Sequence, residues 1–156
     1  ASGFGMKVRA YDPYVKELPE EFQSYVTLCG ENEVISGCDF LSLHLPLNDE
    51  TRNMISAPQL ASMKAGAYVI NAARGGIVNE KDLYEALVSG HIAGAAMDVS
   101  EVEPMAEENP LRTLDNVIIT PHIGMYSKEA IGAVSLICAQ NVAACAAGAE
   151  LKFQVV

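Results

Sequence analysis

Short apolar runs alternate along this chain with segments of helical pattern, and this alternation constrains the fold more than any other feature. Strands are expected at residues 6–11, 26–29, 39–45, 67–71, 92–99 and 116–120. Helices are expected at residues 31–37, 58–63, 79–88 and 127–148. Strands that alternate with helices in short succession indicate a parallel sheet. The sequence therefore predicts an α/β fold with a doubly wound, Rossmann-like parallel sheet.

The first glycines of the chain, Gly3 and Gly5, suggest a dinucleotide-binding loop but fail its pattern. In that pattern G-x-G-x-x-G follows the first strand and opens a helix, whereas these glycines precede a strand and Val8 holds the third glycine position. Asp12 ends this strand, where an acid that binds the adenosine ribose is expected. If Asp12 has that role, the first strand, the glycine loop and its helix precede residue 1, so the sheet is incomplete. Alternatively, Asp12 and Pro13 only form a turn.

Length and charge limit the class of protein. A chain of 156 residues, half of them hydrophobic, can bury the core of one domain. Its 20 acidic and 10 basic side chains give a net charge of −10 with no basic cluster, which argues against nucleic acid and membrane partners. We also expect every apolar stretch to be interrupted before the roughly 18 residues that span a membrane. These features predict a cytoplasmic protein.

The four cysteines are expected to be buried, reduced thiols. Their spacing matches neither a zinc site nor a CxxC motif, and no metal site is expected. They are Cys29, Cys38, Cys138 and Cys145.

The last expected helix begins after Ser127, a favourable N-cap residue. One apolar stripe runs along it at helical spacing. It consists of Ile131, Val134, Cys138, Val142 and Cys145. The stripe faces the sheet, another domain or a partner subunit, and periodicity does not distinguish these.

Polar side chains follow three successive strands of the predicted sheet. Arg74 follows the strand at 67–71, Asp98 and Glu103 follow the next strand, and His122 follows the last one. The carboxyl ends of parallel strands meet at one edge, which is where ligands bind in open α/β sheets. We therefore expect these residues to form a site there.

The residue types at this edge suit a particular chemistry. Arginine binds a carboxylate with two hydrogen bonds, and histidine exchanges a proton near neutral pH when a carboxylate orients its ring. Beside a nicotinamide, such a set can interconvert a 2-oxo acid and a 2-hydroxy acid by hydride transfer. Each residue also has a plain alternative: Arg74 in a turn, Glu103 in an acidic loop, and His122 bonded to a backbone carbonyl.

Three runs in this order resemble the signature segments of the D-isomer-specific 2-hydroxyacid dehydrogenases, nearest to the phosphoglycerate dehydrogenase-like members. The runs are NAARGGIVNEKDLYEAL, GAAMDVSEVEP and DNVIITPHIG, and HLPLNDETRNMI fits between them. The resemblance covers essentially the whole chain. It implies an NAD-dependent oxidoreductase that acts on a small 2-hydroxy or 2-oxo acid and forms a homodimer.

The resemblance also implies roles for single residues. Arg74 matches the arginine that binds the substrate carboxylate, Glu103 the carboxylate that pairs with the catalytic histidine, and His122 the acid/base itself. Asp12 matches the ribose-binding acid, which favours NAD over NADP, and Asp98 a residue near the nicotinamide amide. Other positions in segments that line the cofactor are Leu45, Pro46, Ala72 and Gly124, and Arg74 and His122 also border it.

The chain departs from the family in two ways. Ser100 stands where many relatives carry an aromatic residue, and Met125 where a second small residue is common. More seriously, the glycine loop and the N-terminal substrate-domain half are missing. Residues 1–124 are then a partial NAD-binding domain, and residues 125–156 a helix and tail that return toward the missing substrate domain.

Three functions are compatible with these sequence features. The first is a dehydrogenase whose isolated chain, without the missing half, is weak or inactive. The second is a non-catalytic, NAD(H)-responsive binding module, because one fold serves many functions. The third is a truncated remnant. The particular 2-hydroxy acid is not specified by this sequence.

Overall fold

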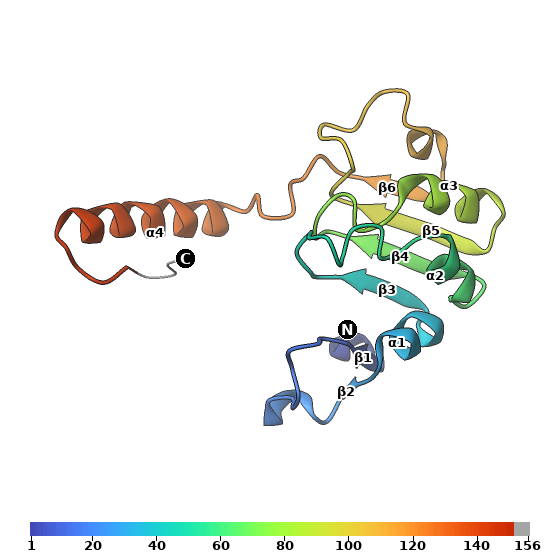
Figure 1. Cartoon of the computed structure of the whole chain (residues 1–156), viewed down its shortest axis with the longest axis horizontal. Helices are drawn as coiled ribbons and strands as arrows, with labels where there is room; N and C mark the ends of the chain where they lie inside the picture. The colour runs from blue at the N-terminus through green and yellow to red at the C-terminus, as the bar shows by residue number, and fades with distance from the viewer. Residues whose placement is uncertain (152–156) are drawn as a thin grey trace. The chain divides into compact units, whose positions relative to one another are not determined.

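The computed structural model describes residues 1–151 (Figure 1). The strands in this range are β1 (Val8–Ala10), β2 (Val26–Leu28), β3 (Phe40–Leu43), β4 (Ala67–Asn71), β5 (Ile92–Met97) and β6 (Val117–Ile119). The α-helices are α1 (Glu31–Gly37), α2 (Ala57–Ser62), α3 (Glu80–Val88) and α4 (Lys128–Ala146). These elements confirm the expected strands and helices, although several strands are shorter. The sequence did not predict the 3₁₀ helices Ser2–Phe4, Glu20–Phe22 and Pro110–Thr113.

The chain divides into two compact units, Ala1–Pro121 and His122–Val156. The first unit contains β1–β6 and α1–α3, and the second contains α4. The expected return of residues 125–156 toward a substrate domain stays a prediction, because such a domain is not among residues 1–151.

The strands of the first unit form two parallel sheets. One has the order β3-β4-β5-β6, and the other pairs β1 with β2. Among the described residues, β3 pairs only with β4 and β1 only with β2. The parallel α/β prediction is confirmed, and the sheet is interrupted between β1 and β3, as expected of an incomplete Rossmann-like sheet.

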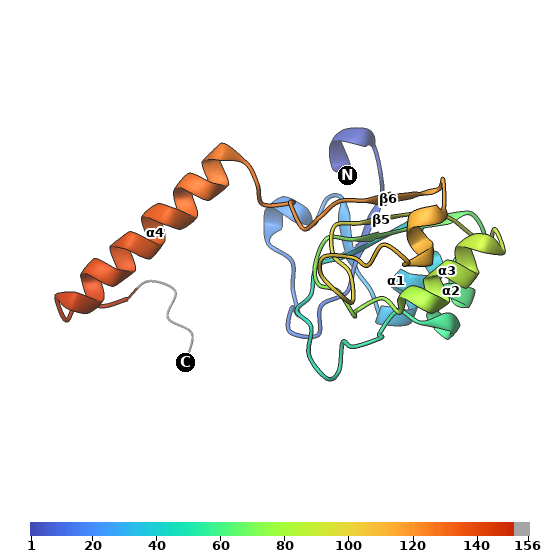
Figure 2. The ribbon, with the colours of Figure 1, turned by 90° about the horizontal axis from the view of Figure 1, so that it is seen from above.

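Helices α2 and α3 cover one face of the four-stranded sheet (Figure 2). Leu60 of α2 and Leu83 of α3 are at most 1% exposed, as is Val69 of β4 beneath them. Burial of such side chains is the main stabilising term of the fold. The core of the first unit therefore lies between these helices and β3–β6.

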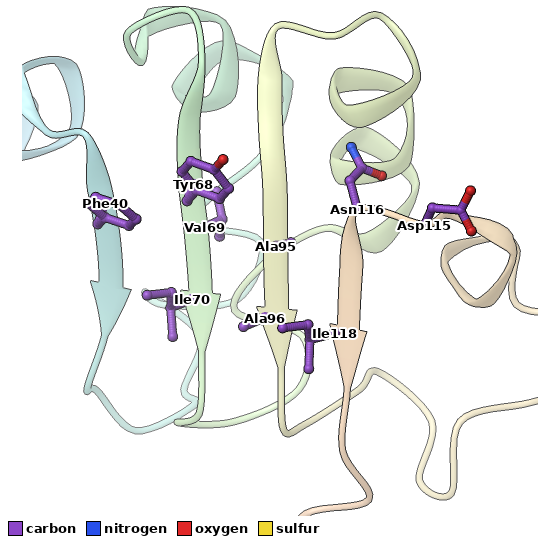
Figure 3. A pocket seen from close by; sticks show the side chains of 9 residues that line it. All are labelled: Phe40, Tyr68, Val69, Ile70, Ala95, Ala96, Asp115, Asn116 and Ile118. Carbon is purple, nitrogen blue, oxygen red and sulfur yellow. The ribbon is translucent and has the colours of Figure 1, made fainter.

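The opposite face of the four-stranded sheet is open (Figure 3). Phe40 and Tyr68 stack on it with ring centroids 5.2 Å apart, and Ile118 is 68% exposed. Helices α2 and α3 of the first unit both lie on the other face of this sheet. A shallow hollow on this open face lies over the strands themselves, and the residues that line it do not include Arg74 or Glu103.

The expectation that no apolar stretch is long enough to span a membrane is wrong for helix α4. Its N-cap is Ser127, as predicted, and the Oγ of Ser127 accepts a hydrogen bond from Ala130 N. Its 19 residues are long and apolar enough to cross a membrane, because Gly132 does not interrupt the helix and the charges lie at Lys128 and Glu129. A helix that is apolar all round is equally typical of the core of a larger protein. None of the residues of α4 is buried within this chain.

The prediction of buried cysteines is wrong in part. All four thiols are free, but Cys29 and Cys38 are only half-buried and Cys138 and Cys145 are exposed. The last two lie on α4, whose apolar stripe is exposed in this chain, so apolar neighbours in the sequence did not imply burial.

Candidate active site

The loops that carry the predicted catalytic residues of the first unit start from the same sheet edge. Strands β4, β5 and β6 are parallel, with Asn71 opposite Met97 and Met97 opposite Ile119. The backbone N–H of Asp98 donates to Asn71 O, and that of Thr120 donates to Met97 O. The three strand ends are thus joined by hydrogen bonds where the carboxyl edge begins.

The buried side chain of Asn71 shapes the loop that carries Arg74. Asn71 is fully buried; its Nδ2 donates to Arg74 O at 3.0 Å, and its Oδ1 accepts from Ala73 N at 3.1 Å. Buried polar groups that are satisfied in this way fix the backbone around them. The Arg74 guanidinium is exposed, and its Nη1 donates to Ala73 O at 2.7 Å. The backbone of Arg74 is therefore held while its charged end stays accessible.

Gly75 brings the Arg74 loop into contact with the loop after β5. A Cβ at this position would overlap the carbonyl oxygen of Ser100. A residue with a side chain is excluded from so close an approach. The backbone of the Arg74 loop is therefore in close contact with the backbone of the loop that carries Glu103.

The Glu103 carboxylate is tied to the start of its own loop. Its Oε1 accepts a hydrogen bond from Ser100 N at 3.2 Å, and Ser100 Oγ donates to Val102 O at 2.8 Å. Ser100 is buried, and its small hydroxyl side chain is accommodated within this turn. The structure thus places the loops of Arg74 and Glu103 together at the carboxyl edge.

Asp98 and Asp12 lie at the ends of different sheets. The Oδ1 of Asp98 accepts a hydrogen bond from Thr120 Oγ1, which links the ends of β5 and β6. Asp12 follows β1, and its exposed carboxylate accepts a hydrogen bond from Tyr14 N at 2.8 Å. The turn alternative for Asp12 is therefore present in the structure. Its role toward a ribose stays a prediction.

The remaining predicted positions are spread over both units. Leu45 packs against the core, whereas Pro46 and Ala72 are exposed after β3 and β4. His122 and Gly124 belong to the second unit. His122 has a φ of 54°, in a region that residues other than glycine rarely adopt. Such backbone outliers cluster at functional sites.

Some residues that shape the loops of the site were not predicted from the sequence. Asn71 was assigned only to a strand, although a polar residue that ends an apolar run just before an arginine was a usable signal. Glu80, Glu101 and Asn109 also went unnoticed, because their contacts join positions 21 and 29 residues apart in the sequence. Within residues 1–151, no group of three His, Cys, Asp or Glu side chains is arranged to hold a metal ion.

A parallel α/β sheet with clustered polar loops at its carboxyl edge defines a Rossmann-like nucleotide-binding domain. Residues 1–124 match the family model described as the D-isomer specific 2-hydroxyacid dehydrogenase, NAD binding domain. The chain belongs to this family of oxidoreductases.

Similar proteins support this assignment. A D-3-phosphoglycerate dehydrogenase from Methanocaldococcus jannaschii is 45% identical over 91% of this chain and 27% of its own length. A hydroxypyruvate reductase from Thermotoga maritima is 46% identical over 83% of this chain and 42% of its own. The NAD-complexed crystal structure of a family member from Lactobacillus delbrueckii ssp. bulgaricus is 34% identical and has a TM-score of 0.84. The match covers 99% of this chain and 50% of that chain. The chain thus spans half the length of these relatives or less.

Proposed function

We propose that this chain is the nucleotide-binding part of an NAD-dependent D-2-hydroxyacid dehydrogenase, similar to phosphoglycerate dehydrogenase. The observation that carries the proposal is the contact between the Arg74 and Glu103 loops at the carboxyl edge. It brings an exposed guanidinium and an anchored carboxylate to the edge where nucleotides bind in this fold.

The proposed chemistry interconverts a 2-oxo acid and a D-2-hydroxy acid. Arg74 binds the substrate carboxylate with two parallel hydrogen bonds, which also orients the adjacent carbonyl. In the direction of reduction, a ring nitrogen of His122 donates a proton to the carbonyl oxygen. Glu103 is assigned the role of the carboxylate that fixes the tautomer of this histidine. When bound, the nicotinamide supplies the hydride.

The residues present fit the adenosine and nicotinamide ends of NAD. Asp12 has an exposed carboxylate just after β1, and its Oδ1 accepts a hydrogen bond from Tyr14 N. A carboxylate there suits a ribose diol and repels the 2′-phosphate of NADP. At the other end, Asp98 is held by Thr120 and borders the Arg74 loop through its backbone bond to Asn71. A pyrophosphate cradle of the G-x-G-x-x-G type is not among residues 1–151.

The test is to replace His122 in the longest in-frame polypeptide that contains this chain. We expect His122→Ala to lower kcat at least about a hundredfold, because general acid catalysis contributes about 10²–10⁴, while the Kd for NADH stays nearly unchanged. The readouts are NADH oxidation with hydroxypyruvate, glyoxylate and phosphohydroxypyruvate, and NADH fluorescence titration. The matched control is His91→Ala, which removes a histidine just before β5, at the opposite edge of the sheet.

The outcomes separate the alternatives. Equal loss of turnover and NADH binding would assign His122 a structural role. NADH binding without turnover in the unaltered polypeptide would favour the regulatory binding module. The absence of both would favour a remnant. The isolated 156-residue chain is expected to be weak or inactive in the same assay.

We further propose a cytoplasmic homodimer. The net charge of −10 opposes binding to anionic lipid, and the charges of α4 lie only in its first turn, so no basic cluster anchors it at a membrane surface. Light scattering after size exclusion tests the dimer, and co-sedimentation with anionic and neutral vesicles tests the location. A monomer would contradict the first proposal, and co-sedimentation with either vesicle the second.

A further inference from the structure

One buried carboxylate bridges the two ends of the loop that carries Glu103. Glu80, the first residue of α3, is 8% exposed. Its Oε1 accepts from Glu101 N, and its Oε2 accepts from Asn109 Nδ2, each at 2.6 Å. Glu103 lies between these two anchor points. Both oxygens of the Glu80 carboxylate therefore have a hydrogen-bond donor in this loop.

The contact with Glu101 is reciprocal. The Oε1 of Glu101 accepts from the backbone N–H of Glu80 at 3.0 Å, so each residue's carboxylate binds the other's backbone. Asn109 has a second contact as well, because its Oδ1 accepts from Leu111 N and caps the following 3₁₀ helix. Both ends of the loop are therefore attached to regular structure.

Helix α3 provides a firm base for these bonds. Asn79 caps it by accepting a hydrogen bond from Asp82 N, and Leu83 in its first turns is fully buried. A negative charge at the first helical residue is also favoured by the helix dipole. The position of Glu80 is therefore set by the core of the first unit.

We propose that Glu80, with Glu101 and Asn109, forms a carboxylate clasp that positions Glu103 for catalysis. The proposal rests on the proposed function, in which Glu103 orients His122. Glu80 is a positioning residue: it acts through the loop and contacts neither substrate nor cofactor. Without the clasp, the loop between residues 101 and 109 has lost the bridge between its ends, so Glu103 samples a wider range of positions.

The polarity of the clasp allows a test by exchange of its partners. Glu80→Gln replaces one acceptor oxygen by an NH₂ group, which then faces one of the two donors, Glu101 N or Asn109 Nδ2. Asn109→Asp places a second carboxylate against the Glu80 carboxylate, with no hydrogen-bond donor between them. In the double variant E80Q/N109D, the new amide at position 80 donates to one oxygen of the new carboxylate at position 109. The other oxygen of that carboxylate still accepts from Leu111 N. Because the double variant also keeps the net charge of −10, it should restore what each single variant loses.

The first readout is amide hydrogen exchange of the 156-residue chain. We expect exchange at Glu101 and at Glu103 to rise at least about tenfold in each single variant, as the loss of a charged hydrogen bond implies, and to return in the double variant. Exchange at Val69 in β4 reports whether the core stays folded. Unchanged exchange at residues 101–103 in both single variants would overturn the proposal, as would a folded double variant that exchanges as fast as the single variants.

The second readout is the kinetics of the longest in-frame polypeptide. We expect kcat to fall at least about tenfold in the single variants and the pH at which kcat is half-maximal to shift, while KM changes less because Arg74 is untouched. The double variant should recover both. A faster-exchanging loop with unchanged kcat and pH profile would overturn the positioning role. An inactive unaltered polypeptide would instead count against the proposed function and leave the exchange result standing.

Discussion

The two sheets of the first unit differ in how they are held. Residues that are buried in the core all belong to the part of the unit from Ile35 to Leu111, where α2 and α3 cover β3–β6. Residues 1–30, which form β1 and β2, contain no buried residue. Both regions have parallel strands, yet only one of them has buried core residues.

The predicted site residues also differ in how their backbones are held. The Arg74 and Glu103 loops grow from β4 and β5, and buried groups such as Asn71 and Glu80 fix their backbones. Asp12 instead follows β1 in the region without buried residues. We therefore expect the Arg74 and Glu103 loops to keep their conformation in this chain and β1, which precedes Asp12, to be less stable.

The largest expected effect comes from removing a core side chain. Leu83→Ala should lower the free energy of unfolding by about 2–5 kcal/mol, because a fully buried leucine leaves a cavity. The matched variant Leu28→Ala in β2 should cost about 1 kcal/mol or less, since Leu28 is only half-buried. Urea unfolding followed by circular dichroism measures both. Equal losses of unfolding free energy would show that β1 and β2 share one core with β3–β6, and would contradict the difference between the two sheets.

A smaller effect is expected from adding one methyl group where the two loops meet. Gly75→Ala should cost about 1–3 kcal/mol, because its Cβ meets the Ser100 carbonyl and one backbone has to move. Gly3→Ala has nothing within 4 Å of its Cβ and should change stability by less than about 0.5 kcal/mol. Thermal unfolding of the two variants provides the measurement. A neutral Gly75→Ala would mean that the loops are not pressed together.

The smallest expected effect is on thiol reactivity. Burial and the Glu33 carboxylate raise the pKa of the Cys29 thiol, whereas burial without Glu33 raises the pKa of Cys38. The thiolate is the reactive form. Glu33→Gln should therefore lower the pKa of Cys29 and speed its alkylation at about pH 8, and leave Cys38 unchanged. Iodoacetamide labelling mapped by mass spectrometry tests this. Equal acceleration of both thiols would indicate loosening of the whole region instead of a local charge effect.

Much of the fold could be predicted because it depends on local patterns. The strand at Ala67–Asn71 and the helix at Glu31–Gly37 have the expected ends, since an apolar run and a short polar helix between glycines are visible in the sequence. The loops of Arg74 and Glu103 could also be placed at one edge, because parallel strands share their direction. These predictions needed no knowledge of which residues touch.

Other features depend on long-range contacts and could not be predicted. The clasp joins Glu80 to Asn109, 29 residues further along, and nothing local marks either residue as buried or paired. The burial of the α4 cysteines was misjudged for a related reason: an apolar pattern shows that a surface can be buried but not whether its partner is present.

The open edges of β1 and β3 also bear on how this chain behaves in solution. Each presents unpaired backbone N–H and C=O groups along one side within the described structure, and β3 adds the apolar face around Phe40 and Tyr68. Exposed strand edges of this kind recruit strands from other chains and lead to aggregation. A net charge of −10 opposes that process through repulsion, and salt screens the repulsion. We therefore expect the solubility of the isolated chain to fall as ionic strength rises.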